Sequence, residues 1–123
     1  MNDPKYYDTF WDKEKFNAAF RDFIHCGWIY CADATEEQIK DFLNSHEKAM
    51  VKPTSASSGK GIHVYKSEPA AELIESKALL EEFVIQHHKM SELNPSSVNT
   101  IRVYTILDKS NTPHILSASI RVG

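Results

Sequence analysis

The sequence predicts an α+β fold in which two helices precede a β-hairpin, and antiparallel strands follow. Three observations indicate this order. Apolar residues recur at helical spacing over residues 12–25 and again after Thr35. Two short apolar runs flank a loop of small and hydroxyl residues at 54–61. Two longer apolar runs, 98–107 and 114–122, enclose a polar turn, which is typical of paired strands.

Composition limits the classes of protein to consider. Hydrophobic residues make up 41% and charged residues 25% of the 123 positions, which is ordinary for one globular domain. The net charge of −3 argues against a nucleic-acid partner, because such a protein presents a basic surface. No apolar run approaches the roughly 20 residues that span a bilayer, and no apolar signal region follows Met1, so a cytoplasmic location is expected.

The first expected helix covers residues 12–25, and its apolar stripe is expected to face the core; the stripe is Phe16, Phe20, Phe23 and Ile24. Gly27 ends this helix, and a short extended segment follows. The second helix opens at the capping box Thr35-Glu-Glu-Gln38, turns Ile39, Phe42 and Leu43 inward, and ends near His46.

Two cysteines flank the extended segment. His25 beside Cys26 suggests zinc, but no second Cys/His pair accompanies it, and buried unreactive thiols at Cys26 and Cys31 are the simpler interpretation. The sequence predicts no metal ligands of its own.

The hairpin is expected over residues 48–66. Its first strand ends at Lys52, because Pro53 lacks the N–H that a strand ladder needs. In this strand Val51 faces one way and Lys52 the other. The glycine-containing loop that follows exposes N–H groups between two lysines, which suits a polyphosphate, although it does not match the P-loop pattern. A plain flexible turn is the alternative.

Charged residues inside apolar strands mark the remaining candidates. Glu81 and Glu82 interrupt a strand over residues 79–85, and either an exposed sheet edge or a ligand would explain them. Strand 98–107 is apolar on both faces and is expected inside a sheet, where Arg102 would need an anionic partner. Arg121 lies on a polar face suited to lining a cleft. A structural ion pair is the alternative for either arginine.

These features, in this order, resemble the ATP-grasp superfamily, and within it the sugar-transfer-associated group near the alpha-L-glutamate ligase-like proteins. The resemblance covers nearly the whole chain and is firmest from Met50 onward. It is carried by Val51-Lys-Pro53, Ser58-Gly-Lys-Gly-Ile62, Leu80-Glu-Glu-Phe-Val-Ile-Gln86 and Asn94-Pro-Ser-Ser-Val-Asn-Thr-Ile-Arg-Val103. It implies one ATP-grasp-like domain with a helical lead-in (1–47), an ATP-lid hairpin with a hinge strand (48–86) and the start of a C-terminal sheet (87–123).

The resemblance implies ATP as the cofactor and assigns contacts to it. Lys52 would neutralise the α- and β-phosphates. Glu81 would accept from the adenine amino group, while backbone groups of Glu82 and Val84 bind the ring edge. Gln86 or His87 would reach the ribose, and this choice stays open. The flap that closes over the phosphates and excludes water would be Ser57, Ser58, Gly59, Lys60 and Gly61.

The implied chemistry is ligation through an acyl-phosphate, with Arg102 and Arg121 as the catalytic residues at the γ-phosphate or at the acyl-phosphate formed from a substrate carboxylate. After Val98, however, Asp108 is the only carboxylate, and it lies in a turn. Carboxylates normally hold the Mg²⁺ of such sites. We therefore expect the chain to be the front part of the domain, with Mg²⁺ ligands beyond residue 123, weak nucleotide binding and no ligation by the chain alone. Missing strands would leave an apolar sheet face through which copies could form a homo-oligomer.

Two interpretations compete. The chain is either the ATP-binding part of a ligase for cell-surface polysaccharide or peptide polymers, or a non-catalytic module that binds a nucleotide or a protein. A kinase-like phosphotransferase ranks below both, because no H-R-D or D-F-G string is present. The carboxylate substrate and the amine-type acceptor are not readable from the sequence.

Overall fold

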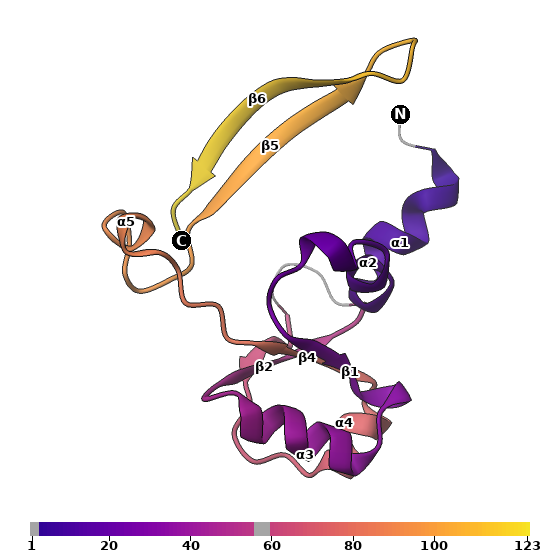
Figure 1. The fold of residues 1–123 in the computed structure, drawn as a ribbon, viewed down its shortest axis with the longest axis vertical. Helices are drawn as coiled ribbons and strands as arrows, with labels where there is room; N and C mark the ends of the chain where they lie inside the picture. Colours follow the sequence, from indigo (N-terminus) through magenta and orange to yellow (C-terminus); the bar gives the residue numbers. More distant parts are fainter. Residues whose placement is uncertain (1–2, 56–59) are drawn as a thin grey trace. The chain divides into compact units, whose positions relative to one another are not determined.

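The structure is a computed structural model that describes residues 3–55 and 60–123. It is α+β, and the described residues form five α-helices and two antiparallel sheets (Figure 1). The chain divides into two compact units, Met1–Phe83 and Val84–Gly123, and each is described by itself. None of the helices in the described ranges is long and apolar enough to cross a membrane.

The first unit contains most of the elements. Its 3₁₀ turns are η1 (Pro4–Tyr6), η2 (Arg21–Phe23) and η3 (Cys31–Asp33). Its helices are α1 (Tyr7–Trp11), α2 (Lys13–Ala19), α3 (Glu36–Ser45) and α4 (Ala70–Glu75). Its strands are β1 (Trp28–Tyr30), β2 (Ala49–Pro53), β3 (His63–Val64) and β4 (Ala78–Glu82). The short extended segment expected after Gly27 is β1.

The four strands form one antiparallel sheet in the order β1-β4-β2-β3. Helices α3 and α4 lie on one side of this sheet and α2 on the other (Figure 1). Val51 of β2 pairs with Leu80 of β4, and both belong to the core under α3 and α4. The buried members of this core are Cys31, Ile39, Val51, Leu73, Ala78 and Leu80.

Helix α3 confirms the prediction made from its capping box. The Thr35 hydroxyl accepts from the Gln38 N–H at 3.2 Å, and the Gln38 side chain accepts from the Thr35 N–H at 2.8 Å. These two bonds satisfy N–H groups that the first turn of a helix cannot pair internally. Ile39 is fully buried, as expected, and His46 is the C-cap.

The helix expected over residues 12–25 differs from the prediction. It is the shorter helix α2 followed by η2, and the separate helix α1 precedes it. The aromatic stripe is not core: Phe23 is 79% exposed, and Phe16 is also exposed. Phe16 instead stacks on Phe20, with ring centroids 4.6 Å apart. The buried position of α2 is Asn17, because the sheet presents a carboxylate to this helix.

The second unit is built on a β-hairpin. Helix α5 (His88–Ser91) precedes strands β5 (Thr100–Leu107) and β6 (Pro113–Arg121), which pair antiparallel. In the turn, one carboxylate oxygen of Asp108 accepts from the N–H groups of Ser110 and Thr112 at 2.8 and 2.9 Å. The two expected strands and the turn between them are therefore present.

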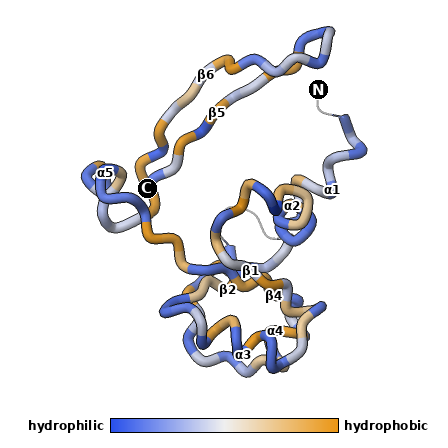
Figure 2. The backbone as a smooth tube through the Cα atoms, viewed as in Figure 1, coloured by the Kyte–Doolittle hydropathy of each residue, from blue (hydrophilic) through white to orange (hydrophobic). Residues whose placement is uncertain are grey.

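The environment of this hairpin corrects two expectations. Strand β5 does not lie inside a sheet, since among the described strands it pairs with β6 alone, and every residue of both strands is exposed. Figure 2 shows hydrophobic stretches along both of these exposed strands. Arg102 is exposed as well, so the prediction of a buried arginine with an anionic partner is wrong.

Candidate functional site

Lys52 and Glu81 meet on one face of the four-stranded sheet. In the register of β2 and β4, Met50 pairs with Glu81 and Lys52 pairs with Leu79, which places both charged side chains on the same face. The Lys52 ammonium forms an ion pair with Glu81 Oε2. The two side chains are 25% and 12% exposed, so the pair is largely shielded from water. The resemblance implied that these two residues share a site, and the structure brings their side chains together.

Asn17 completes this cluster from helix α2. Its Nδ2 donates to Glu81 Oε1 at 3.2 Å, and the residue is only 6% exposed. Both carboxylate oxygens of Glu81 therefore have a partner, as a buried charge requires. The sequence contained a weak signal for Asn17, namely a polar residue beside the aromatic stripe of an amphipathic helix.

Glu82 has a different role from its neighbour. Its Oε2 accepts from the Gly27 N–H at 3.0 Å and lies 4.0 Å from His46 Nε2. The Glu82 N–H itself donates to the Gly27 carbonyl at 2.8 Å, so this N–H already has a partner. A Cβ atom at Gly27 would lie 2.8 Å from His46 Nε2, which explains why glycine suits that position. Through its hydrogen bonds with Gly27, Glu82 thus links the end of β4 to the residue that precedes β1.

The sheet order decides one alternative for the two glutamates. Exposure at a sheet edge does not explain them, because β4 lies between β1 and β2. Internal partners account for both carboxylates in this structure. Their contacts to adenine stay a prediction.

The glycine-containing loop is described only at its ends. Ser57, Ser58 and Gly59 lie outside the described residues, while Lys60 and Gly61 lie within them. Gly61 has φ +72°, and a Cβ atom there would lie 2.8 Å from Pro53 Cγ. The loop therefore returns beside its own start, next to Lys52, and Gly61 permits this return. Its role as a phosphate flap stays a prediction.

Gln86, the predicted ribose contact, holds a loop of the second unit. Its Nε2 donates to the carbonyls of Asn94 (2.9 Å) and Ser97 (2.8 Å). Its Oε1 accepts from the backbone and side-chain N–H groups of Asn99, both at 3.0 Å. His87, the other candidate, accepts from the Lys89 N–H as the N-cap of α5. A ribose would have to compete with these contacts.

Asn99 was not singled out from the sequence, although it lies in one of the strings that carry the resemblance, Asn94 to Val103. It is 5% exposed, and its Nδ2 also approaches the carbonyls of Met90 and Asn94 at 2.8 and 2.9 Å. Its Oδ1 accepts from the Gly123 N–H at 3.3 Å. Asn99 and Gln86 together fix the segment that leads into β5.

Arg102 and Arg121 lie on the same face of the hairpin. Thr100 pairs with Arg121 and Arg102 pairs with Ser119, so the two arginines are diagonal neighbours across β5 and β6. Neither makes an ion pair with another described residue. Two adjacent exposed guanidinium groups can bind an anion such as a phosphate. They belong, with Val84 and Gln86, to the second unit, whereas Lys52, Glu81 and Glu82 belong to the first.

The described residues contain no group of three or more histidine, cysteine or acidic side chains that could hold a metal ion. Cys26 and Cys31 are free thiols, and burial raises the pKa of Cys31 to about 11. The His114 side chain, helped by two backbone N–H groups of the turn, lowers the pKa of Asp108. The Asp108 carboxylate is therefore occupied by hydrogen bonds that stabilise the turn.

A cavity that sequence reasoning did not anticipate lies beside β1. It has a volume of about 280 Å³ and is lined by residues of α2, η2, β1, η3 and α3. The Arg21 guanidinium stands over the Trp28 ring at its rim, 5.5 Å from the ring centroid. Lys52 and Glu81 do not line it.

Comparison with known proteins identified no relative: no family model, curated protein or solved structure matches the chain.

Proposed function

We propose that this chain binds ATP as the nucleotide-binding part of an ATP-grasp-like carboxylate–amine ligase. Lys52 contacts the phosphates in this proposal, and β4 contacts the adenine. The observation that supports it is the contact between Lys52 and Glu81, which are 29 residues apart and which the resemblance to the ATP-grasp superfamily assigns to one nucleotide site.

The ion pair indicates how a nucleotide would enter. Without a ligand, Glu81 neutralises Lys52. A triphosphate carries more negative charge than a carboxylate, so it competes for the ammonium. The released Glu81 oxygen can then accept a hydrogen bond from the adenine amino group, while Asn17 retains the other oxygen. Opening a shielded ion pair costs free energy, which agrees with weak binding.

The reaction implied by the resemblance has two steps. A substrate carboxylate attacks the γ-phosphate of ATP and releases ADP, and an amine then displaces phosphate from the acyl-phosphate. Arg102 and Arg121 would neutralise charge on the transferred group. The described carboxylates near the proposed site are not available to bind Mg²⁺. Glu81 and Glu82 have internal partners, and Asp108 accepts hydrogen bonds within its turn. The proposed products of this ligase are cell-surface polysaccharide or peptide polymers.

A second candidate is a module that binds a nucleotide or a protein without catalysis. The internal partners of Glu81, Glu82 and Gln86 favour it, because side chains with structural tasks are not free for chemistry. Release of ADP from ATP in the presence of mixed carboxylates and amines separates the two candidates. Turnover supports the ligase, and binding without turnover supports the module.

Isothermal titration with ATP and Mg²⁺ tests the shared proposal of nucleotide binding. Replacing Lys52 by methionine removes the charge and keeps the length of the chain, and we expect about tenfold weaker binding. Lys40→Met is the matched control, since Lys40 makes only an exposed ion pair with Glu36 on α3. Equal affinities of the wild type and Lys52→Met, or no binding heat from the wild type, would contradict the proposal.

A further inference from the structure

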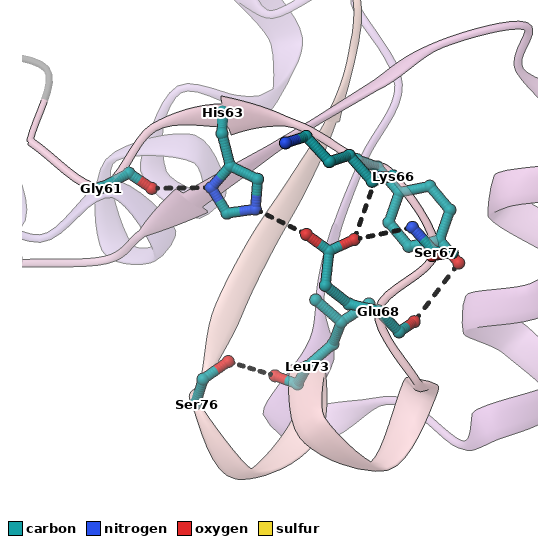
Figure 3. Close-up of polar contacts among 8 residues, drawn as sticks. Gly61, His63, Lys66, Ser67, Glu68, Leu73 and Ser76 are labelled. Atoms are coloured by element: carbon teal, nitrogen blue, oxygen red, sulfur yellow. Dashed lines mark hydrogen bonds and ion pairs between the residues drawn. The ribbon is translucent and has the colours of Figure 1, made fainter.

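The connection from β3 to α4 contains a histidine held between two acceptors (Figure 3). His63 Nδ1 lies 3.2 Å from the Gly61 carbonyl, and His63 Nε2 lies 2.7 Å from Glu68 Oε1. In Figure 3 the ring bridges the end of the glycine-containing loop and the turn that precedes α4. Neither the predicted nucleotide site nor the core uses this histidine.

Both groups that face the ring only accept hydrogen bonds. A backbone carbonyl has no hydrogen to donate, and an ionised carboxylate has none either. The N–H groups of Lys66 and Ser67 donate to Glu68 Oε2 at 3.0 and 3.1 Å. The pKa of Glu68 is lowered to about 2, first because the Lys66 N–H donates to it. Glu68 therefore stays an acceptor throughout the neutral range.

A neutral imidazole cannot satisfy this arrangement. It carries one N–H and one lone pair, so one of its nitrogens would direct a lone pair at an acceptor oxygen. A ring protonated at both nitrogens donates to both oxygens. We propose that His63 is a pH-sensitive clasp, which ties β3 to the turn before α4 through both ring nitrogens when the ring is protonated and holds it more weakly, through one nitrogen, when the ring loses its proton.

The clasp would act on a weakly held strand. Strand β3 has two residues and pairs with β2 through Met50–Val64 and Val51–His63. One further bond extends this pairing, from the Tyr65 N–H to the Ala49 carbonyl at 2.8 Å. A two-residue edge strand has few bonds to keep it in place. Weakening the contacts of His63 therefore weakens the pairing beside Lys52.

Among the described residues, one charged group contacts the ring. Glu68 is the one that contacts it, and Lys52 on the neighbouring strand is paired with Glu81. Lys60 and Lys66, the charged residues nearest in sequence, make no ion pair with a described residue. Glu68 holds its place through the backbone N–H groups even when its contact to the ring is weakened. The clasp thus depends on the ion pair between His63 and Glu68.

Nitrogen-15 NMR of the ring and amide hydrogen exchange test the clasp in the full chain between pH 5.5 and 8.5. We expect both ring nitrogens to carry hydrogens at the acidic end. Protection of the Tyr65 amide, corrected for the intrinsic effect of pH, should fall about three- to fivefold as the ring loses its proton. In Glu68→Gln this fall should be absent. Glu75→Gln, the same change at an exposed position of α4, should behave as the wild type.

Two results would overturn the clasp. One is a Tyr65 amide whose protection does not follow the titration of the ring, and the other is a Glu68→Gln protein that keeps the wild-type pH dependence. If Glu68→Gln loses protection throughout the sheet, it has failed to fold, and His63→Gln replaces it. That variant has no titrating ring, so constant protection across the pH range supports the clasp and a wild-type fall contradicts it.

Discussion

At the scale of single residues, two buried asparagine side chains hold neighbouring polar groups in place. Asn17 is buried under α2, where it donates to Glu81. Asn99 is buried beside Gln86, where it donates to backbone carbonyls and to the Gln86 side chain. Each amide meets acceptors that an apolar side chain would leave unpaired, and unpaired buried groups cost free energy.

Replacing Asn99 by aspartate should destabilise the second unit. The carboxylate would face the carbonyls of Met90 and Asn94, which now accept from the amide. We expect a loss of about 2 kcal/mol, measured as faster amide exchange in β5 and β6. The control is Asn111→Asp, the same change in the hairpin turn, where φ is 59° and aspartate is tolerated. Equal effects of the two variants would argue against the role of Asn99.

Glu68 should make the first unit sensitive to acid. Its pKa is lowered to about 2 in the folded chain, below the ordinary value of 4.5. The folded state therefore binds this proton less readily than the unfolded state, and the stabilisation is fully present above about pH 4.5. It is lost as the pH falls towards 2. Urea unfolding between pH 2 and 5 should show a shallower dependence for Glu68→Gln than for Glu75→Gln. Parallel curves would contradict this.

At the scale of secondary-structure elements, local signals predicted α3 well and α2 poorly. The two hydrogen bonds of the capping box involve residues only three positions apart, so the sequence contains everything needed to recognise them. The orientation of α2 depends on Glu81, which is 64 residues away from Asn17. Helical periodicity could not reveal that partner, and the aromatic stripe was therefore assigned to the wrong face.

Removing the N-cap tests the contribution of the capping box. Thr35→Ala should lower the free energy of unfolding of the first unit by about 1 kcal/mol, because the Gln38 N–H loses its acceptor. Gln38→Glu is the matched control, since a glutamate at this position also completes a capping box. Urea denaturation followed by circular dichroism measures both variants. A Thr35→Ala protein as stable as the control would show that the box contributes little.

At the scale of the whole molecule, the two units differ in how much apolar surface they bury. All the buried hydrophobic residues described, from Cys31 to Leu80, belong to the first unit. The second unit consists of a two-stranded hairpin with exposed faces and a loop fixed by Gln86 and Asn99. Association of copies through the apolar side of this hairpin stays a prediction.

Separating the units should expose this difference. A fragment of residues 1–83 contains the whole described core and should unfold cooperatively in urea. A fragment of residues 84–123 has no buried hydrophobic residue and should lack a cooperative transition, because a two-stranded sheet alone is marginally stable in water. Circular dichroism during urea titration measures both. A cooperative transition in the shorter fragment would contradict this account of its stability.

The sequence by itself determined the α+β class, the ends of α3, the strand that ends around Lys52 and Pro53, and the closing hairpin with its turn. These features depend on neighbours within a few residues, where periodicity, capping and proline chemistry act. Only the tertiary structure decided that β4 is an inner strand, that β5 is exposed, and that Lys52, Asn17 and Glu81 form one cluster. Those outcomes depend on strand order and on partners tens of residues apart, which no local pattern encodes.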